Sequence, residues 1–261
     1  MAAGDLVDRG FVAAVAPLAG EEVFAEALLE DGSTLTLHLK TDDAGNVREI
    51  SEYEEHEDPA PVDAIYAAAP GCGTTSHSLT GFRWNTTYDW YFNAASTPSY
   101  LGTEYVIGAL RRAGNNIIGS DNTCGLGDQV GFTAQYQGIR DVAANVSATG
   151  GCTEADGLNV TGFGDLRAGI LAVTCTWSAA GIARESDARI NKADYLWYAE
   201  LWSGCTRSYG IEAVMTHERG HTAGLGHSTG TGQTMFPSLG PCSDSAATLG
   251  SGDIAGLRRI Y

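Results

Sequence analysis

The sequence reads HERGHTAGLGH from His217 to His227, which is the pattern HExxHxxGxxH. On a helix, the i, i+4 spacing places His217 and His221 on one face, where both imidazoles can bind one ion. Gly224 lets the helix end and the chain turn, so that His227 supplies a third ligand. Three nitrogen ligands leave a fourth tetrahedral position for water, and Glu218 stands beside them as a base. The sequence therefore predicts a catalytic zinc site.

A methionine follows this motif in a segment that is typical of a tight turn. Gln233-Thr234-Met235-Phe236-Pro237 places Met235 eight residues past His227. Such a methionine can form an apolar floor beneath a metal, although methionines more often fill gaps in a core. The spacing favours the turn.

With this segment, the histidine motif resembles the metzincin metalloproteases, and in particular the matrixins, whose pattern HExGHxxGLxHS followed by MxP is matched here. The chain is similar to a secreted, bacterial-type matrixin over most of residues 80 to 261. The resemblance implies an α+β fold with a twisted, mostly parallel sheet, a backing helix, an active-site helix and a C-terminal helix. It also implies a Met-turn at Met235, with Gly224 ending the active-site helix.

The resemblance implies a secreted zinc endopeptidase that hydrolyses peptide bonds with zinc-activated water and Glu218 as the general base. An extended peptide would pair with an edge strand near Leu171 and Ala172. Its specificity pocket would lie around three residues after the Met-turn, namely Phe236, Pro237 and Ser238. A catalytically latent or inactive binding protein on the same scaffold, and a zinc hydrolase of a non-peptide substrate, are the alternatives.

Two arginines depart from the family pattern. The family usually has a histidine for a structural zinc where this chain has Arg189, so we expect one catalytic Zn²⁺ and no structural zinc there. Calcium is possible, but no acidic cluster indicates a site for it. The family usually has an apolar residue at the position of Arg219, where a buried guanidinium needs a partner. The candidates are Glu212, Asp253 and Asp187, unless Arg219 reaches solvent along its aliphatic stem.

The hydrophobic pattern predicts the elements around the zinc helix. Thr97 and Pro98 open a helix that runs to about residue 112, with Thr97 as its cap. Ser251 is a candidate N-cap for a closing helix, with Asp253 in its first turn. Strands are predicted at residues 84–92, 131–136, 158–163, 169–176 and 183–190, and the zinc helix at about residues 210–223.

The front of the chain differs from the rest in charge. The net charge is −17, and residues 1–66 hold 16 acids against three bases, which is −13. We divide the chain into an acidic N-terminal extension at residues 1–68 and a catalytic domain at residues 69–261. The extension contains a predicted hairpin, 23–29 with 34–40, an acidic run at 52–58 and a Pro-rich linker at 59–61. A propeptide, a solvated tail and an accessory module all explain it.

Six cysteines without CxxC spacing indicate three disulfides and an oxidising compartment. No signal peptide is visible in the given chain, yet a secreted protein is expected. Cys205 with Cys242 is the preferred pair, because it would brace the start of the zinc helix against the loop after the Met-turn. Cys72 lies in a P-x-C-G setting that resembles the zinc-capping cysteine of matrixin propeptides, but a structural disulfide is the stronger interpretation.

Composition excludes some partners. A chain this acidic is not expected to bind nucleic acid, and no apolar run reaches membrane-spanning length. We expect a monomer that acts on a protein or peptide substrate, without a nucleic-acid or membrane partner.

Overall fold

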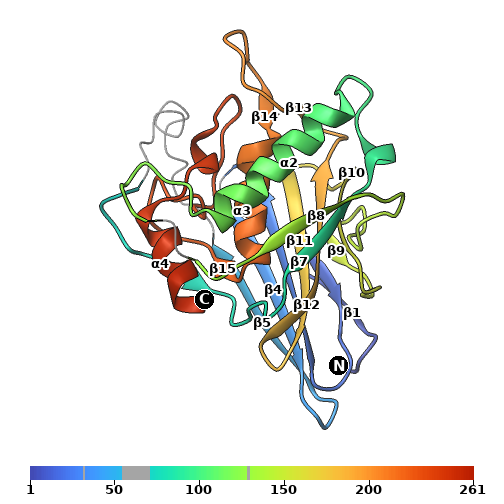
Figure 1. Cartoon of the computed structure of the whole chain (residues 1–261). Coiled ribbons are helices and arrows are strands. Elements are labelled where there is room, and N and C mark those ends of the chain that lie inside the picture. The colour runs from blue at the N-terminus through green and yellow to red at the C-terminus, as the bar shows by residue number, and fades with distance from the viewer. Residues whose placement is uncertain (32, 55–70, 128–129) are drawn as a thin grey trace.

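The computed structural model describes residues 1–31, 33–54, 71–127 and 130–261, and its centre is an eight-stranded mixed sheet (Figure 1). The strand order is β5-β4-β3-β11-β12-β10-β7-β8. In that order the strands are Val47–Glu54, Thr34–Thr41, Glu21–Leu29, Ile170–Ala179, Ile182–Asn191, Asn159–Gly164, Tyr88–Phe92 and Ala134–Ile139.

The sheet has two halves with different pairing. The three pairs from β12 to β8 are parallel, whereas the four pairs from β5 to β12 are antiparallel. The α+β class is confirmed, but the expectation of a mostly parallel sheet is wrong for the whole sheet. The physical reason is the N-terminal segment, because its three strands join by hairpins, and hairpins can only pair strands antiparallel.

The N-terminal strands β3, β4 and β5 are part of this eight-stranded sheet. The predicted hairpin is confirmed, with β3 and β4 paired from Glu22↔Lys40 to Leu28↔Thr34. Val23, Leu37 and Leu39 have no exposed surface, so a solvated tail is the wrong description of these strands. The predicted linker at residues 59–61 and the acidic run from residue 55 onward lie outside the described residues.

Each face of the sheet has its own covering layer. Helices α2 (Thr103–Ile118) and α3 (Ile211–Thr222) cover one face and enclose the larger apolar core (Figure 1). A three-stranded sheet of β1 (Leu6–Asp8), β2 (Ala13–Val15) and β9 (Gly151–Cys152) packs on the other face around a second core. The central sheet thus lies between two helices and a layer to which the N-terminal strands β1 and β2 and the later strand β9 contribute.

The remaining elements are short, apart from the closing helix. β6 (Ser78–Leu79) pairs with β15 (Leu225–Gly226), and β13 (Leu196–Tyr198) pairs with β14 (Ser208–Gly210). Two 3₁₀ turns, η1 (Ala94–Ser96) and η2 (Ser245–Ala247), precede α2 and the closing helix α4 (Ser251–Ile260). Within the described part of the chain, every helix is too short or too polar to cross a membrane.

Most predicted elements are confirmed, with shifted ends. The helix predicted from Thr97 begins only at Thr103 and runs to Ile118, because Thr97 is extended (ψ 129°) and Gly102 is the N-cap. Ser251 is the first residue of α4 and Gly250 is its N-cap, whereas Asp253 lies in the first turn as predicted.

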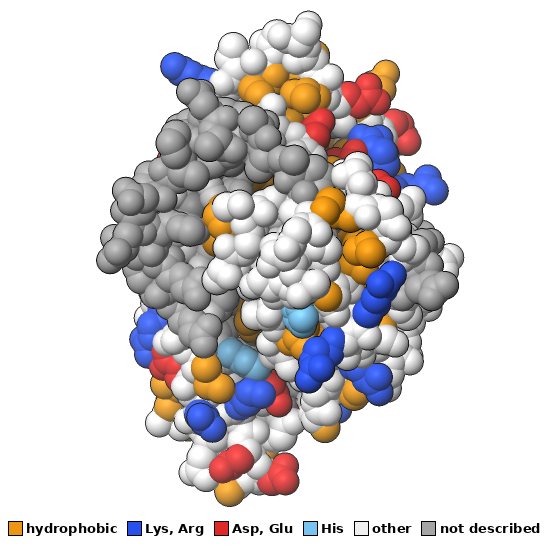
Figure 2. All heavy atoms as spheres, turned by 90° about the vertical axis from the view of Figure 1, so that its left-hand side faces the viewer, with side chains coloured by type: hydrophobic (Ala, Val, Ile, Leu, Met, Phe, Trp, Pro, Cys, Tyr) orange, Lys and Arg blue, Asp and Glu red, His pale blue; other side chains and the backbone are white. Residues whose placement is uncertain are grey.

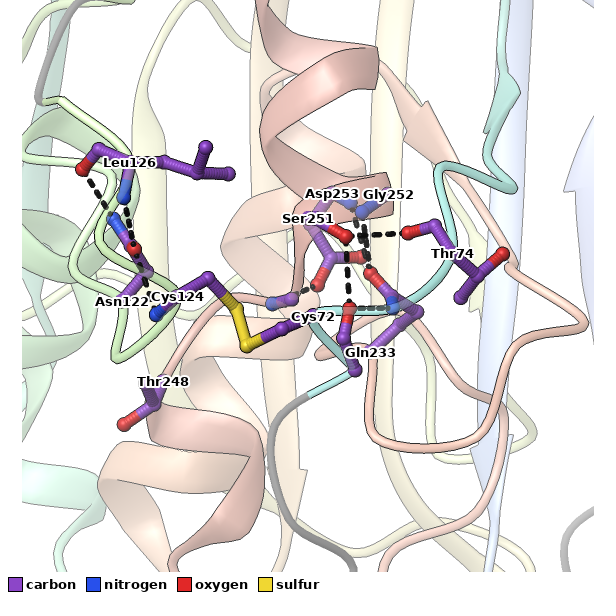
Figure 3. Close-up of a disulfide and its surroundings, with 12 residues drawn as sticks. Cys72, Thr74, Asn122, Cys124, Leu126, Gln233, Thr248, Ser251, Gly252 and Asp253 are labelled. Carbon is purple, nitrogen blue, oxygen red and sulfur yellow. Dashed lines mark hydrogen bonds between the residues drawn. A yellow bond between two sulfur atoms is a disulfide. The ribbon is translucent and has the colours of Figure 1, made fainter.

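Three disulfides join Cys72 to Cys124, Cys152 to Cys175 and Cys205 to Cys242, which confirms the preferred pair. Cys72 is therefore held in a structural disulfide. Figure 3 shows the segment next to it bound to the start of α4: the Ser251 hydroxyl donates to the carbonyl oxygens of Gly71 (2.9 Å) and Thr74 (2.5 Å). The disulfide thus ties this segment to the loop after α2, and the hydrogen bonds tie it to α4.

Gly224 is required by the backbone at the end of α3. Its φ is +99°, and a Cβ there would lie 2.5 Å from the carbonyl oxygen of Phe82. We expect Gly224→Ala to lower the free energy of unfolding by about 2 kcal/mol or more, since both strain and a backbone clash oppose it. Urea unfolding measures the change.

The matched control is Gly114→Ala in α2, where a Cβ would meet no atom within 4 Å. That change should be neutral or stabilise by up to about 1 kcal/mol, because alanine is the better helix former. Equal effects of the two substitutions would contradict the assignment of a backbone constraint to Gly224.

Candidate metal centre

Helix α3 carries most of the site and is enclosed by the fold. Eleven of its twelve residues are buried, with Glu212 as the exception. The helix begins after Gly210 and runs to Thr222, so His217, Glu218 and His221 lie in its second half. The chain then turns at Gly224, and β15 leads directly to His227. The backbone therefore brings the three predicted ligands to one place.

The three imidazoles face one another. Their ring centroids lie 4.8 Å apart for His217 and His221, 4.7 Å for His221 and His227, and 5.3 Å for His217 and His227. The Nε2 atoms of His217 and His221 are 3.1 Å apart. His217 and His221 are fully buried, so water cannot screen this contact.

Backbone carbonyls decide which nitrogen of each helix ring carries the proton. His217 Nδ1 lies 2.8 Å from the Thr234 carbonyl oxygen, and His221 Nδ1 lies 2.9 Å from that of Leu225. A carbonyl oxygen only accepts, so each Nδ1 donates, and in the neutral rings both Nε2 lone pairs face each other. Such an arrangement requires a cation at the Nε2 atoms, which is a metal ion or a proton.

A fourth side chain completes the cluster. Glu26 of β3 places Oε2 3.1 Å from His221 Nε2 and Oε1 3.0 Å from His227 Nε2, with no exposed surface. One ligand atom from each of the four residues lies within 4.8 Å of the others. Three imidazole nitrogens and one carboxylate therefore converge on one buried point.

The donor set and spacing fit zinc. Zinc–nitrogen bonds of about 2.0–2.1 Å in a tetrahedron place neighbouring ligand atoms about 3.3 Å apart. Three of the six separations are 3.0 to 3.1 Å, close to that value, and all six are at most 4.8 Å. Burial and the neighbouring His221 lower the pKa of His217 to about 3, which keeps it neutral and able to bind a metal.

Protonation competes with the metal at His221. Burial alone would lower the pKa of His221, but the Glu26 carboxylate outweighs this and raises it. Without a metal, a proton on His221 would balance the negative charge of Glu26. Metal binding therefore has to displace this proton.

Glu218 lies next to the cluster but is held by a different strand. Its Oε2 accepts a hydrogen bond from the Thr174 hydroxyl of β11, and Oε1 has no hydrogen-bond partner among the described residues. Burial and the nearby negative charge of Glu26 raise the pKa of Glu218. One oxygen is therefore fixed, and the other is available.

Met235 lies in a turn directly against the zinc helix. Its side chain is 1% exposed, and a Cβ added to Gly220 would lie 2.2 Å from its sulfur. The Ser228 amide donates to the Met235 carbonyl oxygen at 2.8 Å. The turn therefore packs on α3 between the two helix histidines and stays close to His227.

Comparison with known proteins identifies the family. The family model described as Matrixin matches residues 84–261. The chain belongs to the matrixin family.

Individual matrixin relatives match over shorter stretches. The chain is 38% identical over 72 residues to Metalloendoproteinase 1 of Glycine max, which covers 26% of this chain and 23% of that protein. It is 36% identical over 62 residues to neutrophil collagenase of Homo sapiens, covering 24% of this chain and 13% of the relative. Metalloendoproteinase 1-MMP of Arabidopsis thaliana is 43% identical over 51 residues, covering 20% of this chain and 14% of the relative. The chain thus spans less than a quarter of each relative's length.

In this matrixin, the residues predicted to contact substrate lie in two places. Leu171 and Ala172 are fully buried in β11, and Ala172 pairs with Leu28 of β3 and with Ile190 of β12. The prediction that this strand is a free edge is therefore wrong, because the N-terminal strand already pairs with it. The residues after Met235 follow its turn, with Pro237 buried and Phe236 and Ser238 half-buried.

A cavity of about 300 Å³ borders the third histidine, His227. Residues of β3, β4 and the segment around β6 line it, together with His227, and Phe236, Pro237 and Ser238 do not. Figure 2 shows histidine side chains at the surface in the lower half of the view, near Lys and Arg side chains. The N-terminal strands therefore form one wall of the space beside the metal centre.

Glu26 and Thr174 were missed by the sequence reasoning. Glu26 is the single acid in the apolar run VFAEALL, and a carboxylate at such a position must be paired when the strand is buried. That signal was present, but only the tertiary fold identifies the partner. Nothing in the sequence distinguishes Thr174 from other strand threonines.

None of the three expected carboxylates pairs with Arg219 among the described residues. Glu212 binds Arg112 of α2, Asp187 accepts from the amides of Asn145 and Val160, and Asp253 accepts from backbone amides of the Met235 turn. Arg219 is 1% exposed, so it does not reach solvent either.

Aromatic rings and hydroxyls hold this guanidinium instead. Its Cζ lies 4.6 Å from the centroid of Trp90 and 5.0 Å from that of Tyr88. The guanidinium donates to the Tyr88 hydroxyl and, at 2.6 Å, to Thr161 Oγ1. Cation–π contacts and charge-assisted hydrogen bonds thus replace a carboxylate and fix α3 on β7 and β10.

A double-mutant cycle tests this contact. Arg219→Met and Tyr88→Phe should each destabilise the protein, and the pair should show a coupling of about 1–3 kcal/mol in urea unfolding, because the hydroxyl and the guanidinium satisfy each other. Tyr91→Phe, in the same strand, is the control and should show no coupling to Arg219. Additive effects of Arg219→Met and Tyr88→Phe would contradict the assignment.

Asp253 connects α4 to the Met235 turn and predicts a pH dependence. Its carboxylate accepts from the amides of Thr234 (2.6 Å), Gly250 (2.9 Å) and Met235 (3.2 Å). Burial nevertheless raises the pKa of Asp253 to about 6, and the three amides only partly offset this. The folded state therefore holds this proton more tightly than the unfolded state, and its contribution to stability falls as pH rises from about 4 to 6.

We expect the unfolding free energy of the wild type, relative to Asp253→Asn, to drop by about 2 kcal/mol between pH 4 and pH 7. Urea titrations at each pH measure this drop. The proteins are first freed of metal with a chelator, so that the pH dependence of metal binding does not contribute. If the difference in unfolding free energy between wild type and Asp253→Asn does not change with pH, the pKa of Asp253 in the folded protein is an ordinary one.

Proposed function

We propose that this chain is a secreted zinc-dependent endopeptidase that hydrolyses peptide bonds in protein or peptide substrates. The observation that carries this proposal is the convergence of three histidine Nε2 atoms on one buried point beside Glu218. Membership of the matrixin family supports the zinc metalloendopeptidase class. Three disulfides support an oxidising, extracellular setting.

His217, His221 and His227 would hold the zinc ion, which supplies Lewis-acid polarisation of the scissile carbonyl and of a water molecule. The carbonyls of Thr234 and Leu225 keep the Nδ1 protons in place, so the helix histidines present their Nε2 atoms. Met235 would form the apolar floor of the site. Gly224 would form the turn that brings His227 to the metal.

Glu218 is the proposed general base. Thr174 fixes Oε2, so Oε1 is the oxygen that accepts the proton from water and passes it to the leaving amine.

The peptide is proposed to lie along β11 at Leu171 and Ala172, with a side chain directed toward Phe236, Pro237 and Ser238. This placement requires the side of β11 that pairs with β3 in the intact chain, since strand addition recognises a peptide through its main chain at a free sheet edge. A monomer suffices for this chemistry, because one chain supplies every proposed ligand and the base.

The test compares wild type with Glu218→Ala, each with zinc, on an unfolded protein substrate. We expect Glu218→Ala to keep one zinc per chain and to lose about 10²- to 10⁴-fold in hydrolysis, because the base is lost while the ligands remain. Intact-mass and fragment analysis measures internal cleavage. Both proteins are assayed before and after brief trypsin treatment, because Arg48 in the N-terminal strands is exposed and offers a cleavage site.

Glu212→Ala is the matched control, since Glu212 is on the same helix but binds Arg112. It should retain hydrolysis. Undiminished hydrolysis by Glu218→Ala would refute the base assignment. No hydrolysis by any preparation that holds one zinc per chain would refute the endopeptidase proposal.

A further inference from the structure

Strand β3 lies along β11 in the place proposed for a bound peptide. The two strands are antiparallel over nearly their full lengths, from Ile170↔Leu29 to Ala179↔Glu21, with one irregularity near Ile170. The peptide proposed above would need the same side of β11. The chain therefore already fills this position with its own N-terminal segment.

The side chains of β3 alternate as those of a bound peptide would. Val23, Ala25 and Ala27 belong to the core on the far face of the sheet, whereas Phe24 and Leu28 belong to the core under the helices. The Phe24 ring lies 6.2 Å from the His221 ring. Strand β3 thus directs every second side chain toward the helix-covered face of the sheet, where Phe24 and Glu26 reach the metal centre.

Glu26 lies at the middle of this face. It is directly opposite Thr174, whose hydroxyl binds the candidate base Glu218. Its two carboxylate oxygens contact the Nε2 atoms of His221 and His227. A metal ion bound by the three histidines would therefore meet a carboxylate where a catalytic site needs water and the scissile carbonyl.

We propose that β3 is an internal, substrate-like inhibitor, in which Glu26 caps the metal ion as its fourth ligand while the strand occupies the peptide-binding side of β11. The inference rests on the proposed function, because it names what blocks that same site. A carboxylate cap excludes water from the fourth position, and a paired strand excludes the peptide. The intact chain is then latent for two independent reasons.

The attachment of β3 is noncovalent apart from the chain itself. All six cysteines lie at residue 72 or beyond, and the three disulfides pair them with one another. Backbone pairing, the apolar contacts of β3 and the metal contact of Glu26 therefore hold it in place. A cut in the chain after β3 would therefore leave only these noncovalent contacts to retain it.

The cap is tested with Co²⁺ as a spectroscopic substitute for zinc and acetohydroxamate as a small metal-binding probe. We expect Co²⁺ in the intact wild type to bind acetohydroxamate weakly, and in Glu26→Gln with an apparent Kd lower by about 10-fold or more, because the competing ligand is gone. Glu26→Ala, which removes every ligand atom at this position, should behave like Glu26→Gln. The visible absorption of Co²⁺ reports the binding of the metal and the binding of acetohydroxamate, so no hydrolysis assay is needed.

Glu22→Gln is the matched control. Glu22 is on the same strand and face, but pairs with Lys40 (2.7 Å) and His38 (2.9 Å). It should leave the acetohydroxamate affinity unchanged. Equal affinity in wild type and both Glu26 variants would overturn the cap, whereas absence of Co²⁺ binding at one per chain in all proteins would instead refute the metal centre.

Hydrogen exchange tests the link between the metal and the strand. Adding zinc to the metal-free wild type should slow amide exchange across Glu21–Leu29, because Glu26 ties β3 to the ion. The slowing should be lost in Glu26→Ala and kept in Glu22→Gln. Equal slowing in wild type and Glu26→Ala would show that β3 is held independently of the metal.

Discussion

The site depends on the close approach of three imidazoles and the Glu26 carboxylate in the interior of the protein, where no water separates them. Two bare Nε2 atoms, the third imidazole and a carboxylate cannot be buried together unless a cation balances them. The helix spacing, the turn at Gly224 and the pairing of β3 with β11 all serve this convergence. These three features of the fold together create a buried site that a cation can occupy.

Further polar contacts orient the histidines and hold α3 in position. Backbone carbonyls from the Met235 turn and from β15 orient the two helix histidines, and Asp253 binds the amides of the same turn. On the opposite side of α3, Arg219 sits against Tyr88 and Trp90. The helix is thus fixed on both sides by polar contacts that an apolar core alone would not provide.

The sequence was informative where the chemistry is local. The three histidines and Glu218 lie within eleven residues, and helix periodicity together with one glycine turn is enough to bring them together. The hairpin of β3 and β4 and the Cys205–Cys242 disulfide were also predictable, since turn residues and loop position indicate them. The family match covers residues 84–261, which contain all of these except the hairpin.

The rest depended on contacts between distant segments. Glu26 is about 190 residues from the histidines, so only the docking of β3 on β11 identifies it as a fourth ligand. The same docking changed the sheet from mostly parallel to mixed. The partners of Arg219 were missed for a related reason, because the expectation considered only carboxylates, whereas the guanidinium is satisfied by rings and hydroxyls of two strands.

The burial of β11 has a consequence for the chain once β3 is gone. All ten residues of this strand are buried, and removal of its neighbour would turn it into a long apolar sheet edge with unpaired backbone groups. Such an edge attracts any extended polypeptide, with little regard for its side chains. The released form would thus gain broad affinity for unfolded chains and, by the same physics, a tendency to associate with itself.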